Sequence, residues 1–106
     1  MEARIVIAVY KPKEGKSAAL QQLTRDHLSI LKQQDLVTNR ASIMMQAKDG
    51  IIIEVFEWKS KAAIEQAHTN PEVLKMWSRY AQVCEYIPIA QLEEANQMFA
   101  DFTPFA

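Results

Sequence analysis

Two histidines are the side chains of this chain best suited to move a proton near neutral pH. His27 and His68 are its only imidazoles, and both fall in stretches whose helical apolar period predicts that they face inward. His27 lies four residues after Leu23 and four before Leu31, which predicts that it points into the core. Hydrogen bonding inside the core is the commoner use of such a histidine, and contact with a substrate is the alternative. His68 is the candidate catalytic base; since no carboxylate partner is evident, packing or capping is its alternative.

Large aromatic residues supply candidate walls for a binding pocket. Trp58 ends a strongly apolar, β-branched run, and Trp77 and Tyr80 lie three residues apart on one face of a later helix. Core packing is the commoner role of such aromatics. The candidate substrate-binding residues are Trp58, Trp77, Tyr80 and His27. Tyr80 would add a hydroxyl to the pocket.

Composition and charge exclude several other kinds of site. The 106 residues carry a formal net charge of −1, so no basic surface is available for nucleic acid. The single cysteine, Cys84, forms no internal disulfide, and two glycines are too few for a phosphate-binding loop. We therefore expect no metal or other cofactor. We also expect a cytoplasmic location, because no leader peptide is evident and no apolar run reaches the ~20 residues of a membrane span.

The alternation of apolar patterns predicts a single domain over residues 1–106. Its order, strand–helix–strand–strand–helix–strand, is the ferredoxin-like βαββαβ arrangement, an α+β fold with helices on one face of an antiparallel sheet. Ser17 and Ser60 are the expected caps of the first two helices. The expected strands cover residues 3–10, 37–47, 51–58 and 97–105, and the expected helices cover 16–34, 61–69 and 71–85.

The turn at residues 48–50 sets the register of the central hairpin. A two-residue Asp49-Gly50 turn and a three-residue loop ending in a left-handed Gly50 are both open. They differ by one residue, which turns one strand's side chains to the opposite face. The three-residue loop sorts the side chains better, because it gathers apolar residues of both strands on one face.

That register predicts two unlike faces of the sheet. Ile5, Ile7 and Ile53 belong to a wholly apolar face, which suits packing against helices. The other face mixes large apolar residues, Trp58 among them, with the charged Glu54. Because it is too apolar to meet water alone, we expect it to pack on a second copy of the chain as a homodimer. Trp58 would then lie at the interface, and it is open whether it shares one pocket with His68 on the helix side.

Three short stretches give the chain a resemblance to a known family. They are the strand exit EVFEWKS at residues 54–60, His68 followed by a proline and an aromatic-bearing helix, and the tail FADFTPF at residues 99–105. With the order of elements, they resemble the antibiotic biosynthesis monooxygenase family of dimeric α/β barrels. The resemblance covers nearly the whole chain and implies a homodimer of ferredoxin-like domains.

The resemblance implies a cofactor-independent monooxygenase that oxidises an electron-rich phenol or quinol. In such members Trp58 matches a pocket tryptophan and His68 matches a common histidine of the following helix. A haem-degrading branch uses an asparagine on the first strand and a histidine on the last helix. Residues 3–10 and 74–80 contain neither. The alternative function is a non-catalytic dimer that binds a small hydrophobic or aromatic molecule, and a third possibility is a structural dimer with a filled interior.

Overall fold

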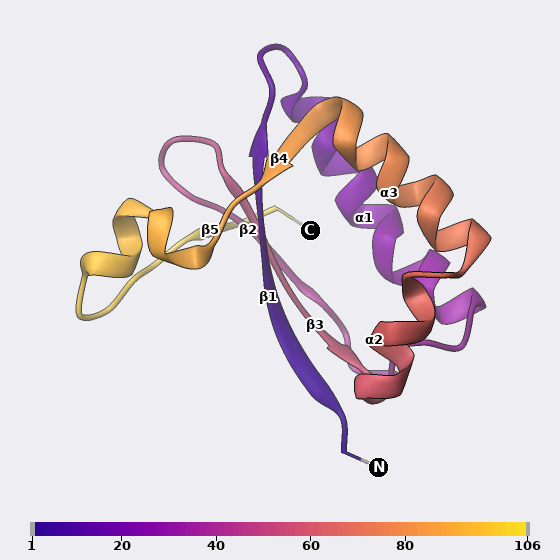
Figure 1. The fold of residues 1–106 in the computed structure, drawn as a ribbon. Coiled ribbons are helices and arrows are strands. Elements are labelled where there is room, and N and C mark those ends of the chain that lie inside the picture. The colour runs from indigo at the N-terminus through magenta and orange to yellow at the C-terminus, as the bar shows by residue number, and fades with distance from the viewer. Residues whose placement is uncertain (1, 106) are drawn as a thin grey trace.

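The computed structural model describes residues 2–105, which form a five-stranded antiparallel sheet with three α-helices on one of its faces (Figure 1). The strand order is β4-β1-β3-β2-β5. This confirms the ferredoxin-like α+β fold expected from the sequence. The strands are β1 Arg4–Pro12, β2 Ile43–Gln46, β3 Ile52–Trp58, β4 Cys84–Tyr86 and β5 Thr103–Pro104, and the helices are α1 Ser17–Gln33, α2 Lys61–Ala67 and α3 Pro71–Val83.

The hairpin between β2 and β3 has the three-residue loop. Ala47 and Ile51 close the loop through a backbone hydrogen bond of 2.8 Å, and Met45 pairs with Ile53. Gly50 has φ +93°, a left-handed conformation that glycine adopts without strain. The predicted register is therefore confirmed. The expected strand at 37–47 is shorter than predicted, because only residues 43–46 pair continuously with β3.

The two helices after β3 begin at side-chain caps. The Ser60 hydroxyl accepts a hydrogen bond from the Ala63 N–H at 3.1 Å, as predicted for α2. The Asn70 side chain caps α3, and Pro71 occupies its first turn. Ser17, in contrast, is the first residue of α1 and not its cap, and the capping position, Lys16, makes no side-chain cap bond. These caps set where α2 and α3 start, and so fix where His68 and Trp77 stand.

The faces of the sheet are used in the opposite sense from the prediction. The helices pack on the mixed face, where Ile52, Phe56 and Trp58 are buried in the main core. The expectation that this face meets a second subunit is wrong. The mixed face was not expected to pack against helices because it carries Glu54. The Glu54 carboxylate is buried there, hydrogen-bonded to side chains under the helices. A buried polar group that finds partners can remain in a core.

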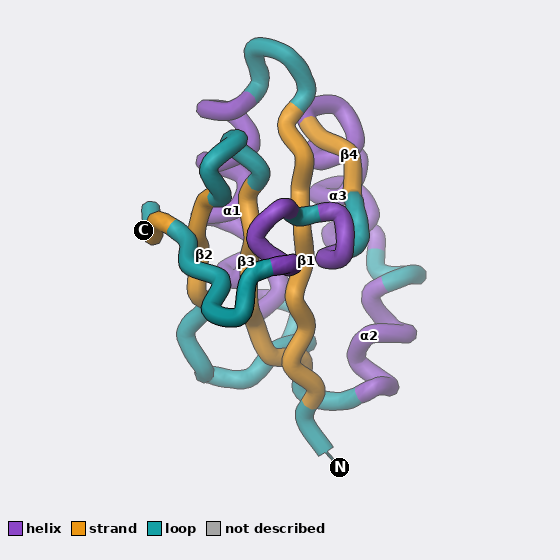
Figure 2. The backbone as a smooth tube through the Cα atoms, turned by 90° about the vertical axis from the view of Figure 1, so that its left-hand side faces the viewer, coloured by secondary structure: helices purple, strands orange, loops and turns teal. Residues whose placement is uncertain are grey.

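The wholly apolar face is partly covered by the C-terminal segment. Figure 2 shows this segment, with the short 3₁₀ helices η1 (Ile89–Gln91) and η2 (Glu93–Asn96), crossing in front of the sheet. Leu92 lies there in a second buried cluster with Val9 and Ile53. The uncovered part leaves three isoleucines more than half exposed: Ile5, Ile7 and Ile43.

The last strands differ from the prediction. Residues 84 and 85 were expected to end the last helix, but residues 84–86 form β4, which pairs with β1 and completes the βαββαβ unit. Cys84 is buried while Glu85 and Tyr86 are exposed, so this short strand shows no alternation that would distinguish it from the long helical period before it. The expected edge strand at 97–105 is reduced to β5, two residues paired with β2.

No helix among residues 2–105 is long and apolar enough to cross a membrane.

Candidate functional site

A cleft of about 340 Å³ opens on the helix-covered side of the sheet. Four of the five predicted site residues meet there, namely His27, Trp58, His68 and Trp77. The sequence left open whether Trp58 and His68 share one pocket; they do, because the face of β3 that carries Trp58 lies under the helices. The full lining is Val6, Ala8, Tyr10, His27, Phe56, Trp58, His68, Trp77 and Tyr86.

His27 and Glu54 form a buried pair at the base of this site. His27 projects from the inner face of α1 and is 3% exposed, while Glu54 on β3 is fully buried. The imidazole Nδ1 lies 2.9 Å from Oε1 and 3.1 Å from Oε2 of the carboxylate. Because an ionised carboxylate only accepts hydrogen bonds, this contact places the proton of a neutral imidazole on Nδ1. Nε2 is then the ring nitrogen left to meet a ligand.

Tyr10 is the second partner of the same carboxylate. Its hydroxyl donates a 2.8 Å hydrogen bond to Glu54 Oε1 from the neighbouring strand β1. Burial, and after it the Glu54 charge, hold the pKa of Tyr10 well above its ordinary value, so the phenol stays a donor. Tyr10, Glu54 and His27 thus make a continuous hydrogen-bonded set that joins two strands to α1.

Aromatic rings enclose His27. The Phe56 ring stands edge-on to the imidazole, with centroids 5.0 Å apart and planes at 87°. Phe56 in turn contacts Trp58 at a centroid distance of 5.4 Å. Both side chains are buried and line the cleft. An apolar wall beside a buried carboxylate strengthens the electrostatic interactions of the pair, because little water is present to screen them.

His68 has a different environment. It is the C-terminal cap residue of α2 and is exposed to solvent, although it lines the cleft. Its ring stands against Trp77 of α3 at a centroid distance of 5.1 Å. Its side chain makes no hydrogen bond to another described residue. The prediction that His68 points inward is wrong: the buried side of α2 is formed by Ala63 and Ala67, and His68 lies beside it on the exposed end of the helix.

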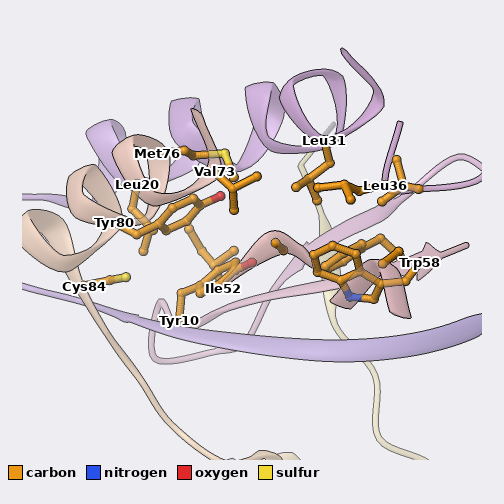
Figure 3. Close-up of a cluster of buried hydrophobic side chains, with 14 of the residues drawn as sticks. Tyr10, Leu20, Leu31, Leu36, Ile52, Trp58, Val73, Met76, Tyr80 and Cys84 are labelled. Carbon is orange, nitrogen blue, oxygen red and sulfur yellow. The ribbon is translucent and has the colours of Figure 1, made fainter. Parts of the chain in front are cut away.

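Tyr80 is the predicted site residue that does not line the cleft. Figure 3 shows its ring coming from α3 toward that of Tyr10 inside the core. The two ring centroids are 5.0 Å apart, and that of His27 is 5.6 Å from Tyr80. The residue is fully buried and its hydroxyl has no hydrogen-bond partner among residues 2–105. Burial raises the pKa of Tyr80 far above its ordinary value. Tyr80 therefore packs behind the site and gives the cleft no hydroxyl.

Sequence reasoning missed Glu54, Tyr10 and Tyr86. Glu54 carried a signal, a carboxylate on the mixed face of an apolar strand, but that face was expected to meet a second subunit and not the helices. Tyr86 lines the cleft from β4, and burial raises its pKa to about 12. Nothing in the sequence marks Tyr86, since the strand that positions it was itself missed.

The other nucleophile and ligand types do not form a site. Cys84 is buried, and burial raises the pKa of its thiol to about 11, which keeps it protonated and weakly reactive near neutral pH. Within residues 2–105, no three histidine, cysteine, aspartate or glutamate side chains are placed to hold one metal ion. With Nδ1–H bonded to a buried carboxylate, the arrangement suits Nε2 of His27 to act as a general base toward a ligand in the cleft.

Comparison with known proteins supports the fold. The chain is similar to the solved structure of Rv0793 from Mycobacterium tuberculosis, with a TM-score of 0.63 and 19% sequence identity. The likeness covers 89% of this chain and 99% of that one. No protein-family model matches the chain, and no curated protein matches its sequence. The comparison confirms the predicted fold, and membership of a family stays a prediction.

Proposed function

We propose that this protein is a small cofactor-independent monooxygenase that oxidises an electron-rich phenol or quinol. The proposal is supported above all by the buried His27–Glu54 pair in an aromatic cleft. It also draws on the sequence resemblance to the antibiotic biosynthesis monooxygenase family. His27 replaces His68 as the base in this proposal, because of the two histidines His27 is the one whose Nδ1 bonds a carboxylate.

The first step is loss of a proton from the substrate to His27 Nε2. The product is an imidazolium held against the Glu54 carboxylate, so the buried negative charge gains a positive partner. A charge-separated pair of this kind is stabilised most where water is scarce, and Phe56 and Trp58 keep water from the inner wall. The same apolar wall favours a planar aromatic substrate.

The second step is carried by the substrate anion. With an anthrone-type substrate, the anion gives electrons to dioxygen and forms a carbon–oxygen bond as a hydroperoxide. Cleavage of the oxygen–oxygen bond converts the CH₂ carbon to a carbonyl and releases the second oxygen atom as water. One substrate and one dioxygen give one quinone and one water, so the substrate supplies every electron. The protein's part is to bind the ring, take the proton and return it to the departing oxygen.

We also propose that the protein is a homodimer joined through the open part of the sheet. Ile5, Ile7 and Ile43 are 58%, 52% and 57% exposed on the face opposite the helices. Neighbouring exposed isoleucines on one sheet face are the kind of apolar patch that a partner subunit covers. This face is the wholly apolar one, so the surface differs from the one expected from sequence. The cleft lies on the other side and stays open.

Oxygen consumption by the purified, metal-free protein with an anthrone or a substituted quinol tests the proposed reaction. We expect His27→Gln to abolish turnover and His68→Gln, at the exposed rim, to reduce it at most several-fold. Turnover that survives His27→Gln, in a variant whose melting temperature is unchanged, would show that His27 is not the base. Thermal stabilisation by the same compounds without oxygen uptake would instead support a non-catalytic binding protein.

A further inference from the structure

Glu54 has two partners of unlike character. One is an imidazole, that of His27, and the other is the hydroxyl of Tyr10, whose pKa burial holds well above its ordinary value. The tyrosine hydroxyl donates to Oε1 at 2.8 Å, and the imidazole Nδ1 bonds Oε2 at 3.1 Å while it also lies 2.9 Å from Oε1. The two donors therefore share one carboxylate, whose charge is delocalised over both oxygens, and a change at one donor alters the charge that the other meets.

The shared carboxylate allows Tyr10 to influence the basicity of His27. A hydrogen bond from a neutral hydroxyl withdraws negative charge from the carboxylate, and charge-assisted bonds of this type are the strong ones. Without that bond, more of the charge is directed at the imidazole, which then holds its second proton more firmly. In a buried site little water is present to weaken this effect.

We propose that Tyr10 is a positioning residue that sets the basicity of His27 through Glu54. This rests on the proposed role of His27 as the base, but it concerns the free protein and can be measured without any substrate. Tyr10 fits the task because its hydroxyl stays protonated over the whole range in which an imidazole titrates. A donor that ionised in that range would add a charge and reverse the effect.

The other groups near His27 are few. Tyr80 faces it from α3, while Tyr86 on β4 and His68 at the end of α2 line the same cleft. On α1 itself, the neighbouring charged residues Arg25 and Asp26 are exposed, pointing away from the core. Tyr80 is the natural control, because its ring packs on both Tyr10 and His27 but its hydroxyl bonds nothing among the described residues.

The test is a proton NMR titration of the His27 ring in the full chain, followed through its Cε1–H signal. Tyr10→Phe should raise the pH at which His27 is half protonated by about one unit, because the carboxylate facing the imidazole then keeps more of its negative charge. Tyr80→Phe should move it by no more than a fifth of that. An unchanged or lowered half-protonation pH in folded Tyr10→Phe overturns the proposal.

A second variant keeps the inference testable if Tyr10→Phe does not fold. Site-specific 3-fluorotyrosine at position 10 retains the hydroxyl and makes it a stronger donor, so the half-protonation pH of His27 should fall. A rise, or no change, overturns the proposal. Failure of the enzyme hypothesis has a different signature: His27 would respond to position 10 as described, yet no phenol or quinol would drive oxygen uptake.

Discussion

Replacing Glu54 with glutamine should remove catalysis while leaving the stability of the fold nearly unchanged. The carboxylate is fully buried, with Tyr10 donating to one oxygen and His27 Nδ1 within 3.1 Å of both. Glutamine has nearly the same shape. Its amide oxygen can still accept from Tyr10, and its NH₂ group can donate to an unprotonated Nδ1. The hydrogen bonds survive, but the proton of the imidazole moves to Nε2.

The expected changes are small for stability and large for catalysis. No hydrogen bond is lost and a buried charge is removed, so the free energy of unfolding should change by less than about 1 kcal/mol. For a domain of this size that is a melting-temperature change of no more than ~4–8 °C. The wrong tautomer, in contrast, removes the base, and loss of general-base catalysis lowers the rate by about 10²–10⁴-fold.

Thermal unfolding and oxygen uptake on the same preparations provide the assay, with Glu57→Gln as the matched control. Glu57 lies on the same strand, but its carboxylate accepts from Thr38 and faces Arg40, away from the cleft. This control should keep its turnover. Glu54→Gln with turnover within tenfold of the unaltered protein would refute the reasoning, and so would a loss of activity explained by unfolding.

Two further predictions concern the dimer and the tyrosines. Ile7→Glu places a charge on the exposed sheet face and should convert the dimer to a folded monomer, measured by light scattering after size exclusion. Lys11→Glu, on the same strand but beyond the exposed isoleucines, should leave the dimer intact. A monomeric unaltered protein would contradict the proposed interface. Burial raises the pKa of Tyr86 to about 12 and that of Tyr10 above its ordinary value. Since these phenols ionise more easily unfolded, their contribution to stability is fully present below pH ~10 and falls as the pH rises toward the folded-state values. Absorbance at 295 nm should show tyrosine ionisation together with unfolding; ordinary titration of all three tyrosines near pH 10 in folded protein contradicts the burial.

Much of the architecture followed from local patterns in the sequence. Alternating β-branched residues located β1 and β3, and the sorting of apolar side chains onto one face favoured the three-residue loop that sets the hairpin register. Ser60 and Asn70-Pro71 located the starts of two helices. Each of these signals is decided by a few neighbouring residues. For that reason they survive without knowledge of the rest of the fold.

The use of the two sheet faces did not follow from the sequence. The apolar–polar pattern favours the wholly apolar face for packing against the helices, and the carboxylate of Glu54 argued against the mixed face. Its partners, His27 and Tyr10, are 27 and 44 residues away in the chain, and their convergence depends on how α1 crosses the sheet. The pattern of apolar and polar residues is therefore misleading at a buried polar network, because it does not show which distant side chains will hydrogen-bond the buried group.

The same cause misplaced the candidate base. His68 was favoured because it matches a common histidine of the family that the sequence resembles, and His27 was assigned to the core by its helical spacing from Leu23 and Leu31. In the fold His27 is buried and lines the cleft, and its Nδ1 bonds Glu54. His68 is exposed at the rim of the same cleft. A carboxylate inside an apolar strand and a histidine on the inner face of a helix are together the signal that could have paired them.

The central claim is that Nε2 of His27 is the free base in the cleft. Nitrogen-15 NMR of the ring, at a pH where the imidazole is neutral, tests it most directly. The geometry predicts the Nδ1–H tautomer, with an unprotonated Nε2 signal that becomes protonated when an acidic phenol binds. A neutral ring carrying its proton on Nε2 would contradict the account, because that nitrogen could not then accept a proton from any substrate.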